Sequence, residues 1–101
     1  MKSIKPWHVY MLRLKDNSLY TGATTDVQRR LFEHQKTKKA SKYVRSRLPC
    51  KLVFVIETKN RSDAQKFEAA IKKLSKKEKE EIVLACSIIT ELKLKLILVD
   101  K

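Results

Sequence analysis

The sequence has few of the residues that mark several protein classes. Its 101 residues include one glycine, two prolines, two cysteines and one tryptophan. Two cysteines, Cys50 and Cys86, are too few for the disulfide framework that stabilises many small secreted domains. No apolar run approaches the roughly 18 residues of a membrane span, and the first six residues lack the apolar stretch of a secretory signal. We therefore expect a cytoplasmic protein with reduced thiols and no membrane partner.

Acidic residues are also few. Lys and Arg number 24 against 11 Asp and Glu, which gives a net charge of +13 and a pI near 10.0. Residues 1–60 carry 14 basic and 4 acidic side chains, whereas residues 61–101 carry 10 and 7. Solubility of a small domain needs a net charge of only about 2–8. The excess predicts a polyanionic partner, and nucleic acid is favoured over the main alternative, an anionic membrane surface.

Length and hydrophobic patterning predict one small α+β domain. The chain is long enough for a single modest core, and with 43% hydrophobic residues it is too apolar to be intrinsically disordered. We expect strands at residues 7–14 and 19–23, a helix at 27–36, a strand at 51–58, and helices beginning near 62 and 76. The resulting order, β-β-α-β-α-α, predicts a small, mostly antiparallel three-stranded sheet flanked by helices.

The second half of the sequence supplies the most specific local signals. The β-branched run at residues 51–58, KLVFVIET, predicts a central strand covered on both faces. Two capping boxes, Ser62 with Gln65 and Ser75 with Glu78, predict the starts of the last two helices. The expected core stripe of the first of these helices consists of Ala64, Phe67, Ile71 and Leu74.

The C-terminal segment is compatible with two structures. Leu92, Leu94 and Leu96 alternate with lysines, which is typical of a strand. Apolar positions at 82, 86, 89, 92/93, 96 and 99 also fit one long helix, and no glycine or proline decides between the two. We favour the strand. We treat residues 86–101 as an extension that packs on a domain formed by residues 1–85.

Several chemically capable side chains fall on neighbouring predicted elements. They are Tyr10 on the first strand, Tyr20 and Gly22 on the second, Arg30 and His34 on the first helix, and Glu68 on the second helix. This arrangement resembles the GIY-YIG nuclease domain, with residues 8–10, HVY, in place of GIY and residues 20–22, YTG, in place of YIG. The resemblance covers roughly residues 7–82 and is strongest to the short stand-alone bacterial branch. It departs from the pattern at His8 and Thr21.

The resemblance implies a metal-dependent endonuclease. Glu68 would hold one divalent cation, usually Mg²⁺, together with water and phosphate oxygens. Arg30 would pair with the scissile phosphate. Tyr10 would act as the general base that activates water, with Tyr20 orienting or sharing its proton and His34 accepting the proton or binding phosphate. Gly22 would keep the site open to close approach.

The most basic segment follows the predicted site in the sequence. Residues 36–47 contain six basic residues and no acidic one, and we expect them to form a loop with one helical turn around Tyr43. The expected nucleic-acid contacts are Lys36, Lys38, Lys39, Lys42, Tyr43, Arg45 and Arg47, with Tyr43 able to stack on a base. DNA is favoured over RNA, and the oligomeric state stays open.

Judged one residue at a time, the same positions allow ordinary structural roles. The two tyrosines fit half-buried packing, His34 fits a surface position, and Glu68 with Lys72 fits a simple ion pair. Two other functions therefore stay open beside the endonuclease. One is a nucleic-acid-binding module with little or no catalysis, and the other is an adaptor that pairs through its C-terminal segment.

Overall fold

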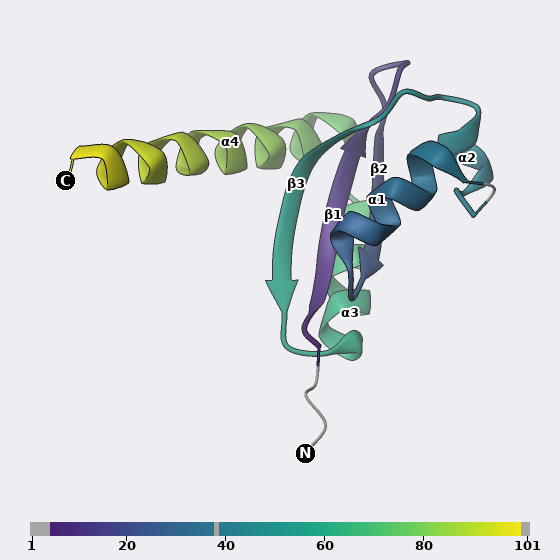
Figure 1. Ribbon diagram of the computed structural model, residues 1–101, viewed down its shortest axis with the longest axis horizontal. Coiled ribbons are helices and arrows are strands. Elements are labelled where there is room, and N and C mark those ends of the chain that lie inside the picture. Colours follow the sequence, from purple (N-terminus) through teal and green to yellow (C-terminus); the bar gives the residue numbers. More distant parts are fainter. Residues whose placement is uncertain (1–4, 38, 100–101) are drawn as a thin grey trace.

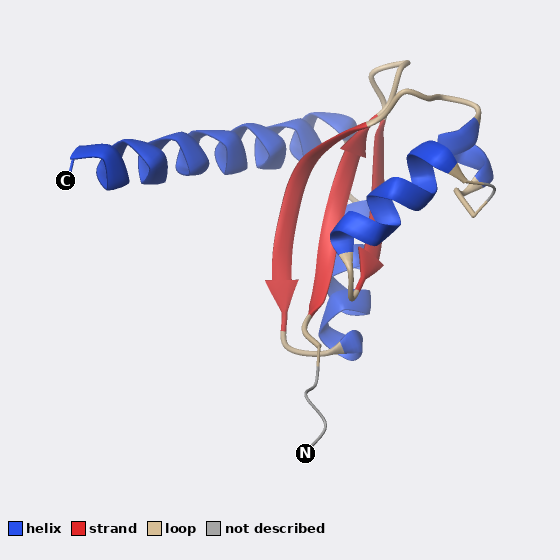
Figure 2. Cartoon of the chain, viewed as in Figure 1, coloured by secondary structure: helices blue, strands red, loops and turns tan. Residues whose placement is uncertain are grey.

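A three-stranded antiparallel sheet forms the centre of the protein. The computed structural model describes residues 5–37 and 39–99, with side chains described as far as residue 89. The strands are β1 (Trp7–Arg13), β2 (Leu19–Thr24) and β3 (Lys51–Thr58), and the helices are α1 (Val27–Lys36), α2 (Lys42–Arg45), α3 (Arg61–Lys72) and α4 (Lys76–Val99). Figure 1 shows this order along the chain, and Figure 2 separates the strands from the helices. The α+β class and the three-stranded sheet are as predicted.

The central strand is β1, not β3. The sheet order is β2-β1-β3, with both pairings antiparallel. Residues 9–12 of β1 are all buried, whereas Val55 in β3 is 40% exposed. The prediction of a central strand at 51–58 is therefore wrong. A run of β-branched residues predicts a strand, but the run does not say whether a partner lies on one side or on both.

Alternate side chains of β1 supply two cores on opposite faces of the sheet. Val9 and Met11 pack with Phe54, Ala64, Ile71 and Val83. Tyr10 and Leu12 pack with Leu14, Val44 and Cys50, and Leu31 and Tyr20 border them. In Figure 1 helix α1 lies in front of the sheet and α3 behind it. The first core therefore joins the sheet to α3 and the start of α4, and the second joins it to α1 and α2.

Side-chain caps fix the starts of the helices. The Asp26 carboxylate accepts a hydrogen bond from the Arg29 backbone N–H, which begins α1. The Ser75–Glu78 capping box is confirmed, with reciprocal hydrogen bonds of 3.0 and 3.2 Å. Helix α3 is capped by Asn60, not by Ser62, because the Asn60 side chain accepts from the Asp63 N–H at 2.8 Å. The helix consequently begins before the predicted position.

Helix α4 replaces the strand that we favoured for residues 92–99. The helix runs without a break across residue 85, where we expected the domain to end and the extension to begin. That division of the chain stays a prediction. Near its start the helix is held to the sheet by the guanidinium of Arg13, which donates two hydrogen bonds to the carboxylate of Glu80. A helix that is capped and anchored at one end can propagate until a breaker intervenes, and the sequence contains none there. In Figure 1 the far half of α4 extends past β3 and away from the sheet. Within the part of the chain that the structure describes, no helix is apolar enough over a sufficient length to cross a membrane.

Candidate active site

Three aromatic side chains from three elements meet on the face of the sheet covered by α1. The Tyr20 and His34 rings meet edge to face with centroids 5.3 Å apart, and the Tyr10 ring lies 6.4 Å from Tyr20 and 6.0 Å from His34. The Tyr10 hydroxyl is 2.9 Å from His34 Nε2. Tyr10 is 2% exposed and His34 is fully buried. We call these three side chains the ring cluster.

Gly22 makes room for the ring cluster. It lies directly opposite Tyr10 in the β1–β2 register. A Cβ atom at residue 22 would lie 2.5 Å from the Tyr10 hydroxyl oxygen and 2.6 Å from Cζ, which is far inside van der Waals contact. The φ angle of Gly22 is not positive, so backbone conformation does not require glycine here. The one glycine of the chain is needed because the Tyr10 ring lies across its backbone.

Burial keeps the Tyr10–His34 pair neutral. Burial, with a smaller contribution from Tyr20, raises the pKa of Tyr10, although the nearby Arg30 guanidinium opposes the shift. Burial and then the positive charge of Arg30 lower the pKa of His34 to about 4. With its proton on Nδ1, His34 accepts the hydrogen bond of the Tyr10 hydroxyl at Nε2. That Nδ1 atom is itself buried and has no hydrogen-bond partner in the structure.

Arg30 brings a positive charge to the edge of the ring cluster. Its Nη1 donates to Glu33 Oε1 at 3.0 Å and to the Lys39 carbonyl at 3.1 Å. Its side chain is 26% exposed, and its charge acts on the pKa values of both Tyr10 and His34. The residue therefore joins the ring cluster to the basic segment, and Glu33 is the partner that orients it.

Glu68 lies near the ring cluster and, among the described residues, forms no hydrogen bond or ion pair with it. It projects from α3 with 23% of its side chain exposed, and its Oε2 is 3.0 Å from Lys72 Nζ. Its negative charge contributes to the raised pKa of Tyr10, as the smallest of the causes. The structure thus brings Tyr10, Tyr20 and His34 into contact, places Arg30 beside them, and leaves Glu68 within electrostatic range only.

Glu68 is the candidate metal ligand, and one carboxylate limits the kind of metal site that can form beside the ring cluster. Among the described residues, no group of three His, Cys, Asp or Glu side chains could hold a metal ion. Mg²⁺ commonly binds through one or two carboxylates, with water and substrate phosphate filling the other positions. Glu68 fits that type of site, since its carboxylate is half-buried and its present neighbour is a cation, the Lys72 ammonium.

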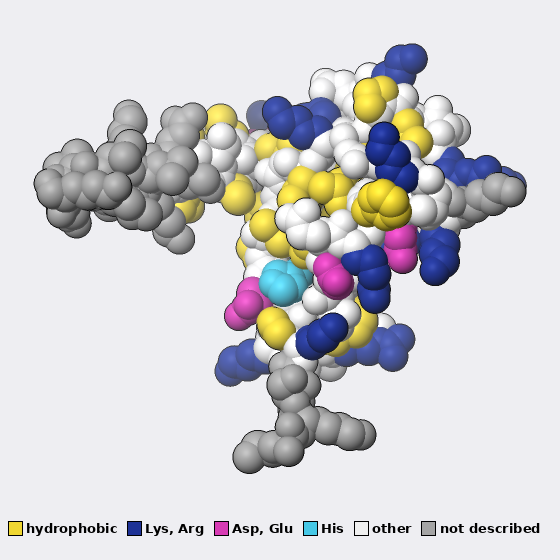
Figure 3. Space-filling model, in the orientation of Figure 1, with side chains coloured by type: hydrophobic (Ala, Val, Ile, Leu, Met, Phe, Trp, Pro, Cys, Tyr) yellow, Lys and Arg dark blue, Asp and Glu magenta, His cyan; other side chains and the backbone are white. Residues whose placement is uncertain are grey.

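The basic segment extends from the end of α1 through α2. Lys36, Lys39, Lys42 and Arg45 are exposed, and Lys38 lies outside the described residues. The predicted helical turn around Tyr43 is present as α2. Figure 3 shows Lys and Arg side chains over this end of the molecule.

Two of the predicted nucleic-acid contacts already have partners. The Arg47 guanidinium lies 3.8 Å from the centroid of the Tyr43 ring, and its Nε donates to Asp16 Oδ2 at 2.9 Å. One face of Tyr43 is therefore covered, and only its other face is available to stack on a base. The charge of Arg47 is partly compensated by Asp16.

Phe32 on α1 is a residue that the sequence reasoning missed. It is 58% exposed, the highest value among the large aromatic side chains of the described chain. Arg29 lies three residues before Phe32 and Lys36 four residues after it, both on the same helix face. A signal was present, since Phe32 follows Leu31 and lies off the apolar edge formed by Val27 and Leu31.

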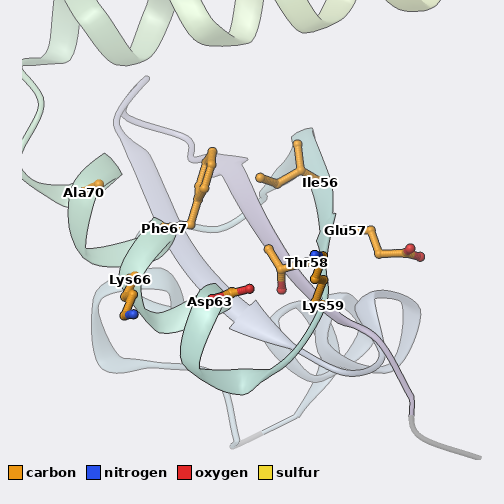
Figure 4. A pocket seen from close by; sticks show the side chains of 8 residues that line it. All are labelled: Ile56, Glu57, Thr58, Lys59, Asp63, Lys66, Phe67 and Ala70. Carbon is orange, nitrogen blue, oxygen red and sulfur yellow. The ribbon is translucent and has the colours of Figure 1, made fainter.

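A pocket in the described part of the chain lies away from the ring cluster. It has a volume of about 500 Å³ between β3 and α3, and Figure 4 shows its lining residues, Ile56, Glu57, Thr58, Lys59, Asp63, Lys66, Phe67 and Ala70. None of the predicted site residues is among them. Phe67 points into this pocket and is 44% exposed, so its predicted place in the core is wrong, whereas Ala64 and Ile71 of the same stripe are buried.

Comparison with known families agrees with the resemblance on which the site was predicted. The sequence profile of the GIY-YIG catalytic domain matches residues 6–81. A UPF0213 protein of Desulfotalea psychrophila is 44% identical over 79 residues, covering 78% of this chain and 72% of that protein. A UPF0213 protein of Yersinia pestis is 49% identical over 78 residues, covering 77% and 81%.

Two solved structures have a similar fold. The solution structure of the UPF0213 protein BH0048 from Bacillus halodurans has a TM-score of 0.52 at 40% identity, covering 79% of this chain and 84% of that one. The solution structure of EF2693 from E. faecalis has a TM-score of 0.58 at 36% identity, covering 87% and 93%. The names of these proteins state no activity.

Proposed function

The chain belongs to the GIY-YIG catalytic domain family, and we propose that it is a small metal-dependent endonuclease that cleaves phosphodiester bonds in DNA rather than RNA. The observation that carries the proposal is the hydrogen-bonded Tyr10–His34 pair next to Arg30. One strand and one helix bring a proton donor, a proton acceptor and a cation together at one place. These are the groups that an attack on a phosphodiester requires.

Tyr10 and His34 form the proton-transfer pair. Because both are neutral at neutral pH, the hydroxyl proton of Tyr10 can pass to His34 Nε2 as the phenolic oxygen takes a proton from water. The low pKa of His34 makes it a weak acceptor when the site is empty. A bound phosphodiester would place negative charge beside His34 and so favour its protonated form. Substrate binding would thus prepare the pair for transfer.

Arg30 and Glu68 complete the site. Arg30 would bind the phosphate that is attacked, where a planar guanidinium offers two parallel donors. Glu68 would hold one Mg²⁺ or another divalent cation, which supplies charge neutralisation and stabilises the leaving oxygen. The basic segment would bind the flanking phosphates without selecting a base sequence. A role in DNA repair or processing and a cytoplasmic location belong to the same proposal.

A nucleic-acid-binding module with little catalysis is the second candidate. The observation that favours it is the burial of Tyr10 and His34, which are 2% and 0% exposed. A buried phenol with a raised pKa is a poor base until the site opens to a substrate. The two candidates share the basic segment and differ only in whether the ring cluster reacts.

A nicking assay separates the candidates. Supercoiled plasmid is incubated with the purified protein in Mg²⁺ or in chelator, using wild type, Tyr10→Phe, Arg30→Ala and Glu68→Gln. Glu57→Gln is the matched control for Glu68→Gln, since Glu57 is an exposed carboxylate on β3. We expect Mg²⁺-dependent nicking by wild type and the control, with losses of about 10²-fold or more in the other three variants.

One outcome would count against the endonuclease, and another against the metal assignment alone. Binding of DNA by the wild type without cleavage in any divalent cation would favour the module. Nicking by Glu68→Gln at the wild-type rate would remove the metal assignment and leave the tyrosine and arginine roles to be judged on their own variants.

A further inference from the structure

The apolar surface of α4 is a large feature that the proposed function does not use. Ile88 and Ile89 are 48% and 53% exposed, and Val55 on the neighbouring β3 is 40% exposed. Leu84 is 61% exposed but lies on another face of the helix and does not line the groove. A groove of about 430 Å³ runs between β3 and α4, lined by Phe54, Val55, Ile56, Ile82, Ala85, Cys86 and Ile89. Monomeric soluble proteins rarely expose contiguous apolar surface of this kind, so the groove and α4 are candidates for an interface.

The apolar positions of α4 repeat with a heptad spacing that continues beyond the part of the helix next to the sheet. Ile82, Ala85 and Ile89 line the groove, and the sequence continues the alternation of three and four residues at Leu92, Leu96 and Val99. In Figure 1 the helix passes β3 and extends beyond it. The family profile ends at residue 81, just before the heptad stripe begins. The backbone of the second half of α4 therefore lies beyond the chain's own sheet.

The charge distribution favours another copy of this chain as the covering partner. Residues 76–101 carry six basic and five acidic residues, a net charge of +1 in a chain of +13. Two copies that meet through α4 would therefore bring together their least charged segments. The basic segment lies on α1 and α2, on the opposite side of the sheet from the start of α4. A membrane surface would be expected to select a helix with a strongly basic polar face, which α4 lacks.

Helix α4 alone is too small to form a stable interface, so the groove must contribute buried area as well. A standard interface buries about 800 Å² on each partner. A helix of 24 residues is about 36 Å long and about 10 Å wide, so one face presents roughly 360 Å² in projection. Helix-on-helix contact is therefore too small alone, and the stripe is shorter than the three to four heptads of an independent coiled coil. Insertion into the neighbouring groove would add the missing area.

We propose that α4 and the groove beside β3 form a homodimer interface, in which the heptad stripe of each chain is covered by the same surface of a second copy. The dimer would be closed and isologous, because each copy offers both the stripe and the groove. It leaves the basic segment and the ring cluster of both copies uncovered. The proposal does not depend on whether the protein cleaves DNA.

Molar mass in solution tests the proposal. The full chain is measured by light scattering coupled to size exclusion, from about 5 to 200 μM, with Ile89→Glu, Leu96→Glu and the matched control Leu84→Glu. We expect twice the 11.8 kDa chain mass for wild type and Leu84→Glu at the higher concentrations. Ile89→Glu and Leu96→Glu are expected to stay monomeric. Because residue 89 is half exposed in the single chain, a charge there costs the folded monomer little, and circular dichroism checks that the fold is retained.

Other results would overturn the proposal. A mass of one chain for the wild type at every concentration would do so, as would a mass that keeps rising beyond two chains. Monomeric wild type that sediments with phosphatidylserine-containing vesicles, and loses this with Ile89→Glu, would assign the surface to lipid. Equal dissociation of the dimer by Leu84→Glu and Ile89→Glu would also contradict the stripe as its basis.

Discussion

Replacement of Gly22 by alanine tests whether the Tyr10 ring determines the residue at that position. The new methyl group would lie 2.5 Å from the Tyr10 hydroxyl and 2.6 Å from Cζ. Moving a buried ring to relieve such a clash costs about 1–3 kcal/mol, and loss of the bond to His34 costs about 1 kcal/mol more. Alanine also reduces the conformational entropy of the unfolded chain, which stabilises the folded protein by about 0.4–1 kcal/mol. We expect Gly22→Ala to lower the free energy of unfolding by about 2 kcal/mol.

Urea denaturation followed by circular dichroism measures this change, and thermal denaturation should show a fall of roughly 10 °C. The control is a double-mutant cycle with Tyr10→Leu, which removes both of the crowded atoms. In that background Gly22→Ala should change the free energy of unfolding by less than about 0.5 kcal/mol. Additive effects of the two substitutions would refute the account, because they would show that Gly22 is needed for a reason other than the ring.

Three further predictions follow from the charges of the site and the fold. Because the pKa of His34 falls from 6.5 to about 4 on folding, the unfolded chain binds the proton more tightly between these values. The contribution of neutral His34 to the free energy of unfolding should be fully present above about pH 6.5 and should fall by roughly 2–3 kcal/mol on acidification to pH 4. Urea midpoints measured across this pH range would show the fall, and the profile of His34→Gln should be flatter. Glu80→Gln should lower the free energy of unfolding by about 1 kcal/mol, because it weakens the paired hydrogen bonds from β1; an unchanged urea midpoint would contradict this. Lys39→Ala and Lys42→Ala should each reduce the salt dependence of DNA binding, the slope of log K against log salt, by about one. Arg47→Ala should change it less, since Asp16 already pairs with that guanidinium. Wild-type slopes in Lys39→Ala and Lys42→Ala would argue against the basic segment as the binding surface.

Local signals predicted most of the fold because short-range physics decides those features. The strands around Tyr10, Tyr20 and Phe54, the helix after Asp26 and the capping box at Ser75 all follow from residues a few positions apart. The central position of β1, where we expected β3, depends on which strands pair in the folded sheet. A single β-branched run does not encode that pairing. The tail was ambiguous because Leu92–Leu96 satisfies a period of 2 and the longer stripe satisfies a period near 3.6. The anchored start of α4 decides it, and that anchor joins Arg13 to Glu80 across 67 residues.

The candidate site could be proposed from the sequence as a set of residues, but its geometry could not be predicted. Matching the family pattern selected Tyr10, Tyr20, Arg30, His34 and Glu68, and the structure places four of these close together. The hydrogen bond between Tyr10 and His34, the burial of both and the position of their rings over Gly22 depend on how α1 packs on the sheet. The Tyr43 ring has one covered face because the Arg47 guanidinium packs on it, and this contact also depends on tertiary packing. Spacing along the chain contains none of this information.

The most direct test of the central claim is a single-turnover cleavage assay with Tyr10→Phe. This substitution removes one oxygen atom from a buried ring and leaves the basic segment, Arg30 and Glu68 in place. With enzyme in excess over end-labelled DNA and Mg²⁺ present, we predict unchanged DNA binding and a cleavage rate at least about 10²-fold below wild type. A Tyr10→Phe protein that cleaves at the wild-type rate would contradict the assignment of the ring cluster as the catalytic centre.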